Sequence, residues 1–181
     1  FGRAWALRAL GQYKEAIKNF DDAINFDKKL YASWNGKGVA LHDLGQYKKA
    51  IECFNKVIRV DKKWKNVWNN KGNALFMLYQ YKKAIECYDE AININKKWKY
   101  PWFNNGQCLD ELGQYKKAIE CYDEVIKIDK KDKHALLNKC DILGKKLGQL
   151  KKAKNCYREV LKIRSENSND WRMDGICFSR L

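Results

Sequence analysis

The sequence has few of the features that mark membrane proteins, metal proteins or enzymes. No apolar run approaches the roughly 18 residues that a membrane-spanning helix needs, and the first residues form neither a signal peptide nor a transit peptide. The chain of 181 residues has only one proline and two histidines, which favours long helices and argues against a histidine-based metal site. It also lacks a nucleophile–base pairing and a glycine-rich phosphate loop. We therefore expect no enzyme activity, no cofactor, no metal and no membrane partner.

Cysteine is present without the pattern of a disulfide framework. The chain has seven cysteines, an odd number, and no Cys-x-x-Cys pair. Because no secretory signal precedes them, we expect reduced thiols in a reducing, cytoplasmic compartment. The chain begins at Phe1 and not at a methionine, so we expect a piece of a longer protein.

A repeat of 34 residues organises the sequence. The segment LGQYKKAIECYDE at Leu112–Glu124 recurs with small changes at Leu10–Asp22, Leu44–Lys56 and Leu78–Glu90. A looser copy at Leu147–Glu159 is displaced by 35 residues, and the extra residue falls within Gly144-Lys145-Lys146. A period of this length indicates stacked copies of one supersecondary unit.

Each copy carries the signals of two amphipathic helices. A tryptophan (Trp34, Trp68, Trp102) precedes a glycine by four residues, which places both on one face of a first helix, with the tryptophan as a core packing residue. A second glycine ends that helix, except where Tyr79 takes its place, so we expect a strained or differently shaped turn there. Tyr, Ala and aromatic residues at steps of three and four then form the apolar stripe of a second helix.

The Trp-Gly-Leu first helix and the Gly-Tyr-Ala-aromatic-Ala second helix resemble the tetratricopeptide repeat family over essentially the whole chain. Pentatricopeptide repeats, at 35 residues, lack this set. The resemblance implies an all-α fold, a right-handed α-α superhelix (solenoid) of helix-turn-helix repeats. The expected units are a partial repeat at 1–30, repeats at 31–64, 65–98, 99–132 and 133–167, and the first helix of a sixth repeat or a capping helix at 168–181.

The resemblance also implies that the first helices line a concave groove that binds a peptide of a protein partner. The matching positions from residue 35 onward contain no Lys or Arg, which suits a peptide better than a phosphate backbone and argues against the family members that clamp a C-terminal carboxylate. Asn70, Asn104 and Asn138 form a column whose amides can hold a peptide main chain. The candidate apolar anchors are Phe76, Met77, Tyr100 and Phe103. The remaining groove candidates are polar or acidic, and the acidic ones favour a basic peptide: Asn35, His42, Asp43, Asn69, Asn73, Gln107, Asp110 and Glu111.

Charge and cysteine leave alternatives open. The net charge is +15, and much of the excess lies in lysine pairs that recur on the second helices and in the closing loops. These pairs predict a solvated outer face, or a surface that binds nucleic acid or an acidic partner. Open repeat ends would also allow head-to-tail self-association. The recurring second-helix cysteines are interpreted as packing residues, because those of neighbouring copies lie too far apart for a disulfide: Cys53, Cys87, Cys121 and Cys156.

Overall fold

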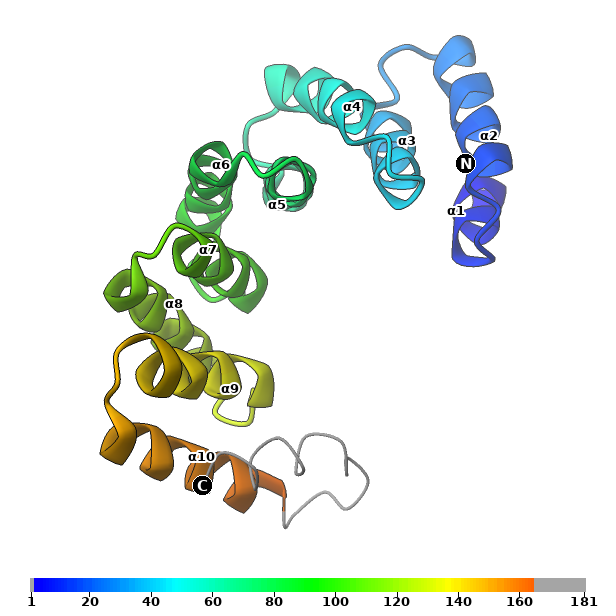
Figure 1. Cartoon of the computed structure of the whole chain (residues 1–181). Helices are drawn as coiled ribbons and strands as arrows, with labels where there is room; N and C mark the ends of the chain where they lie inside the picture. The colour runs from blue at the N-terminus through cyan, green and yellow to red at the C-terminus, as the bar shows by residue number, and fades with distance from the viewer. Residues whose placement is uncertain (1, 165–181) are drawn as a thin grey trace. The chain divides into compact units, whose positions relative to one another are not determined.

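The computed structural model describes residues 2–164, which form helices linked by short turns (Figure 1). The expected helix or cap at 168–181 lies outside the described residues. The chain divides at Lys96–Lys97 into two compact units. Unit 1 contains α1 (Gly2–Ala9), α2 (Tyr13–Phe26), α3 (Tyr31–Asp43), α4 (Tyr47–Val60), α5 (Lys65–Met77) and α6 (Tyr81–Ile94). Unit 2 contains α7 (Lys99–Glu111), α8 (Tyr115–Ile128), α9 (Lys133–Asp141), the π-helical turn η1 (Ile142–Lys146) and α10 (Leu150–Arg164). None of the described helices is long and apolar enough to cross a bilayer.

The pairs α3–α4, α5–α6 and α7–α8 each have an aromatic ring of the second helix that lies against a glycine of the first. A Cβ atom added to Gly38 of α3 would lie 2.5 Å from the ring of Phe54 on α4. The same distance separates an added Cβ at Gly72 of α5 from the ring of Tyr88 on α6. Both rings are fully buried. The glycine at this position is therefore required by the close approach of the second helix to the first.

Trp34 and Trp68 connect consecutive repeats of unit 1 to one another. The indole Nε1 of Trp34 donates to the carbonyl oxygen of Lys28 at 3.2 Å, and that of Trp68 donates to Lys62 at 2.8 Å. Both indoles pack against a buried cluster but remain half-buried themselves. They lie at the edge of the core, between the closing loop of one repeat and the first helix of the next.

The turn inside each helix pair requires a left-handed backbone. Gly45 has φ +77°, and Tyr79 takes the same conformation with φ +58°. The amides of Tyr79 and Gln80 donate to the carbonyls of Phe76 and Leu75, which repeats the bonding at the Gly45 turn. The turn at Tyr79 thus keeps its shape, and a residue with a Cβ atom bears the strain.

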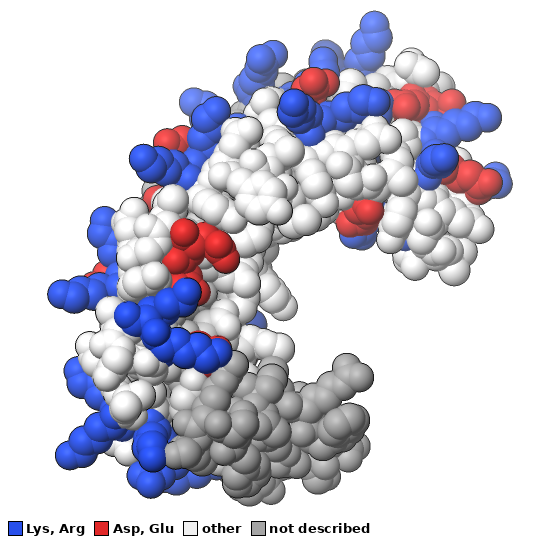
Figure 2. All heavy atoms as spheres, viewed as in Figure 1, with Lys and Arg blue, Asp and Glu red and all other residues white. Residues whose placement is uncertain are grey.

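Lysine side chains gather over the second helices of unit 1 (Figure 2). Lys48 and Lys49 on α4 are exposed, as is the pair at 82–83 on α6. Glu52 follows Lys48 by four residues, yet the two form no ion pair in the described part of the chain.

The last described helix pair departs from the others. Its extra residue is absorbed by η1, a π-helical turn that continues α9 and in which the amide of Leu147 donates to the carbonyl of Ile142 at 3.0 Å. A single inserted residue commonly produces such a turn, because one wider loop of helix accommodates it without breaking the helix.

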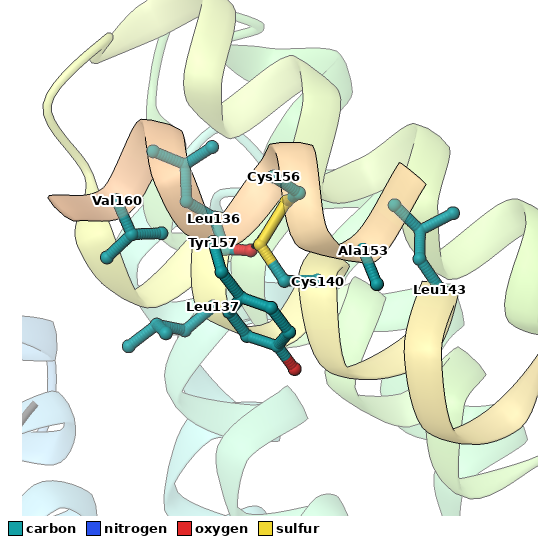
Figure 3. Close-up of a cluster of buried hydrophobic side chains, with 8 residues drawn as sticks. All are labelled: Leu136, Leu137, Cys140, Leu143, Ala153, Cys156, Tyr157 and Val160. Atoms are coloured by element: carbon teal, nitrogen blue, oxygen red, sulfur yellow. Dashed lines mark hydrogen bonds between the residues drawn. A yellow bond between two sulfur atoms is a disulfide. The ribbon is translucent and has the colours of Figure 1, made fainter. Parts of the chain in front are cut away.

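Cys140 and Cys156 are joined by a disulfide (Figure 3), so the expectation of reduced thiols throughout is wrong. Their Cα atoms are 5.5 Å apart, inside a cluster of buried side chains from α9, η1 and α10. Cys140 stands in the glycine column of the first helices, and that column faces the second helix of the same pair. The prediction compared cysteines of neighbouring repeats, whereas the bond forms within one repeat. Cys53, Cys87 and two other buried cysteines are free thiols.

Candidate functional site

Four of the candidate groove residues of unit 1 line a small cavity on the first-helix side: His42, Asp43, Asn70 and Asn73. The cavity has a volume of about 160 Å³. Residues on α3 and α5 separated by three or four positions line it, because such residues share a helix face. It is lined by Arg8, Val39, His42, Asp43, Phe54, Asn70 and Asn73.

Arg8 is a groove residue that the sequence analysis missed. It lies 34 residues before His42, so the repeat period itself places it in the same column, but only the later copies were searched for groove positions. Its Nε lies 2.6 Å from Oδ2 of Asp43, and both side chains are partly exposed. The cation compensates the carboxylate, so this cavity is not acidic.

His42 offers the cavity an unused hydrogen-bonding group. Its Nε2 is buried and has no hydrogen-bond partner among the described residues. The ring is held in place by Tyr47, with the ring centroids 5.3 Å apart in an edge-to-face arrangement. A neutral imidazole nitrogen donates or accepts according to its tautomer, so His42 can pair with either group of a peptide bond.

The asparagines of α5 differ in how they are held. Asn73 Oδ1 accepts a hydrogen bond of 2.9 Å from the hydroxyl of Tyr88, which crosses the gap left by Gly72. Asn70 Nδ2 donates to Asn35 Oδ1 at 3.4 Å, a long contact between adjacent repeats. Asn69, by contrast, is 7% exposed and buried in the helix packing, so its side chain is not open to a ligand.

The two apolar candidates of unit 1 lie at the end of α5, outside the cavity lining. Phe76 is half-buried and packs edge-to-face on Tyr81, with centroids 5.3 Å apart. Met77 is 45% exposed. These side chains present an apolar surface beside the polar cavity.

In unit 2, Phe103 and Asn138 meet at the hydroxyl-bearing ring of Tyr122. The rings of Phe103 and Tyr122 have centroids 5.7 Å apart, and Asn138 Nδ2 donates to the Tyr122 hydroxyl at 3.4 Å. Burial raises the pKa of Tyr122, so its hydroxyl stays protonated and keeps a proton to donate. Asn104 and Gln107 on α7 are half-buried.

The acidic candidates of unit 2 stand at the end of α7. Oδ1 of Asp110 is buried without a hydrogen-bond partner among the described residues. Burial raises the pKa of this carboxyl, while Lys146 opposes the shift. Glu111 is exposed. At the opposite end of α7, Tyr100 is 58% exposed and packs edge-to-face on Trp98.

The described residues offer no metal site, since no group of three or more His, Cys, Asp or Glu side chains within 2–164 is arranged to hold an ion.

Comparison with known proteins gives a uniform result. Two sequence models of the tetratricopeptide repeat match the chain, one at residues 31–63, 66–97 and 100–132 and the other at 1–30 and 134–167. No curated protein sequence is significantly similar to the chain.

Solved structures with the same fold share little sequence. The crystal structure of MamA has a TM-score of 0.85 at 22% identity, covering 92% of this chain and 97% of that one. YrrB, described as a TPR protein with an unusual peptide-binding site, has a TM-score of 0.77 at 21% identity, covering 98% and 89%. PilF of Pseudomonas aeruginosa has a TM-score of 0.80 at 18% identity, covering 90% and 74%. At these identities the likeness shows the fold alone.

Proposed function

Because the chain belongs to the tetratricopeptide repeat family, we propose that it is a protein–protein interaction scaffold whose first helices bind a peptide segment of a partner protein. Such scaffolds are typically non-enzymatic, and repeat solenoids offer extended surfaces for binding. Fold alone does not identify the ligand, so the proposal rests on the residues of the surface.

The observation that carries the proposal is that His42 lines the cavity of unit 1 and that its buried Nε2 has no hydrogen-bond partner among the described residues. A buried polar atom without a partner is costly, and a ligand that supplies the partner recovers that cost. Asn70 lies in the same cavity and its amide can donate to and accept from a main chain. Val39, which is half-buried in the lining of the cavity, contacts the adjoining side chain of the peptide.

The acidic candidates favour a peptide that carries basic side chains. Asp43 is compensated by Arg8, whereas Asp110 and Glu111 have no ion pair with a described residue. Phe76, Tyr100 and Phe103 supply the apolar anchors.

The test uses a peptide selected by display on the whole chain, with its affinity measured by calorimetry. Replacing Asn70 and Asn104 by Ala should weaken binding about tenfold or more, since at least one main-chain hydrogen bond is lost, while the helical circular dichroism stays intact. His42→Phe is a matched variant, because Phe76 occupies that position one repeat later and packs on Tyr81 as His42 packs on Tyr47. It should weaken binding without loss of stability. The control is Lys82→Ala on α6, and unchanged affinity in the Asn70 and Asn104 variant would remove the groove assignment.

A further inference from the structure

A second and larger cavity lies on the second-helix side of unit 1. Its volume is about 640 Å³, within the range of ligand-binding clefts. It runs between α2 and α4 with α3 as its floor, and we call it the α2–α4 trench. It shares no residue with the cavity around His42, because the α3 residues that line it lie on the opposite face of that helix.

The floor of the trench is apolar and its walls are cationic. Ile17, Trp34 and Leu41 are among the residues that form the floor. The walls carry Lys14, Lys37, Lys49 and Lys56 against only two carboxylates, those of Asp21 and Glu52.

Most of this cationic charge is not compensated within the chain. Asp21 forms an ion pair with Lys37, whose Nζ lies 2.5 Å from Oδ1 of Asp21. Lys14 and Lys49 have no ion pair with any described residue, and Lys56 has only its contact with the indole face of Trp34, 4.9 Å from the ring centroid. The ammonium groups of these three lysines therefore surround the apolar floor without forming an ion pair in the described part of the chain. Glu52 is the one carboxylate of the lining that remains near them.

We propose that the α2–α4 trench binds an acidic peptide segment, with an apolar side chain seated among Ile17, Trp34 and Leu41 and flanking carboxylates paired with Lys14, Lys49 and Lys56. A single exposed ion pair contributes little. Three of them around a buried apolar anchor combine charge complementarity with the burial that gives affinity.

Two features favour an acidic peptide over a nucleic acid. Glu52 interrupts the cationic walls, so they do not form the unbroken cationic path that a continuous phosphate chain needs. Single-stranded nucleic acids also bind by stacking bases on aromatic faces, and the ring of Trp34 already carries Lys37 at 5.7 Å and Lys56 at 4.9 Å from its centroid.

The repeat itself supplies a comparison. At 34 residues beyond Lys56 stands Glu90, and beyond Asp21 stands Asn55. The corresponding surface between α4 and α6 thus has two neighbouring glutamates, Glu86 and Glu90, and one lysine fewer. Lys56→Glu reproduces chemistry that the chain already tolerates one repeat later, so the substitution tests binding without threatening the fold.

The experiment measures the fluorescence anisotropy of a labelled peptide in which two leucines one helical turn apart are flanked by glutamates, titrated with the whole chain. The variant Lys49→Glu/Lys56→Glu should lose about tenfold or more in affinity. Lys82→Glu/Lys116→Glu makes the same charge change on exposed positions outside the trench, and it should change affinity less than about twofold. Replacing the leucines of the peptide by serine should abolish most of the binding.

Four outcomes would overturn the proposal. The first is that the acidic peptide does not bind the unmodified chain. The second is that the two double variants weaken binding of the peptide equally, and the third is that the serine peptide binds as tightly as the leucine peptide. In the fourth, an oligothymidylate of equal charge displaces the peptide and itself depends on Lys49 and Lys56, which makes the trench a nucleic-acid site. Asn70→Ala should leave the binding of the acidic peptide unchanged, so this test stands apart from that of the first-helix groove.

Discussion

Tyr79 allows the strain of one turn to be measured against a matched glycine turn. Its backbone has φ +58°, a left-handed conformation that Gly45 adopts at the same place in the preceding repeat with φ +77°. For a residue with a Cβ atom this conformation costs about 1–2 kcal/mol. The comparison of interest is Tyr79→Gly with Tyr79→Ala, because both lose the ring and only alanine keeps the Cβ atom.

The expected difference follows from two opposing terms. Glycine removes about 1–2 kcal/mol of strain, and its greater freedom in the unfolded chain takes back about 0.4–1 kcal/mol. The Tyr79→Gly chain should thus be more stable than the Tyr79→Ala chain by about 1 kcal/mol. The ring of Tyr79 is 79% exposed and reaches only the ring of Tyr81, with centroids 6.1 Å apart, so its loss adds little to either variant.

The reciprocal change gives the control. An alanine Cβ at Gly45 would have no atom within 4 Å, so Gly45→Ala should cost the same amount, about 1 kcal/mol, through the backbone alone. Urea denaturation gives the global values, and hydrogen exchange of the amides of α5 and α6 gives the local ones, since repeat arrays do not always unfold in one step. If Tyr79→Ala proves as stable as Tyr79→Gly, the left-handed strain does not exist and the reasoning is refuted.

Three further predictions concern the disulfide, the buried thiols and the tyrosine hydroxyls. Reduction of the Cys140–Cys156 bond should lower the stability of α9 and α10 by about 3 kcal/mol, because the bond spans a sequence separation of 16. Hydrogen exchange with and without dithiothreitol measures this loss. A Cys140→Ser/Cys156→Ser chain that still responds to the reductant would contradict the prediction. Burial raises the pKa of the Cys53 and Cys87 thiols from 9.0 to about 11. The stability linked to this raised pKa is fully present below the pKa of the unfolded chain, and it is lost as the pH rises toward the pKa of the folded chain. The denaturation midpoint should therefore fall between pH 9 and pH 11, and by less when both cysteines are replaced by alanine; an identical fall would refute the assignment to these thiols. Tyr88→Phe should lower the stability of the fold by about 1 kcal/mol, because the hydrogen bond to Asn73 is lost. Asn73→Val should restore part of that stability in the Tyr88→Phe chain, since Val39 and Phe54 occupy the two corresponding positions one repeat earlier. Strictly additive effects in a double-mutant cycle would argue against this coupling.

The architecture could be predicted from the sequence because a repeat multiplies each weak local signal. A single Trp followed by Gly four residues later indicates little, but the same pair at Trp34, Trp68 and Trp102 fixes the period and the helix faces. The glycine turns followed from the same columns. The shape of the Tyr79 turn did not, because the sequence shows the missing glycine but not whether the neighbouring hydrogen bonds suffice to hold a tyrosine in the left-handed region.

The candidate site was harder to predict, since it depends on which polar side chains remain open. The columns placed His42, Asp43, Asn70 and Asn73 among the groove candidates, and these four residues line one cavity. They did not indicate that Asn69 is buried. Adjacent positions on a helix face different directions, so Asn69 points into the helix packing while Asn70 lines the cavity. The disulfide escaped prediction for a related reason, as its cysteines belong to two different columns that face each other only after the helices pack.

The π-helical turn η1 limits how the units of this chain can be exchanged. The pairs α3–α4 and α5–α6 have the same helix lengths, 13 and 14 residues, and the same ring-on-glycine contact, so one can be duplicated or substituted for the other in a lengthened array. The pair α9–α10 cannot be treated in this way. Its first helix continues into η1, and the Cys140–Cys156 bond joins its two helices. Internal duplication therefore suits the pairs in the middle of the chain, whereas a copy of this pair would carry the inserted residue and the disulfide with it.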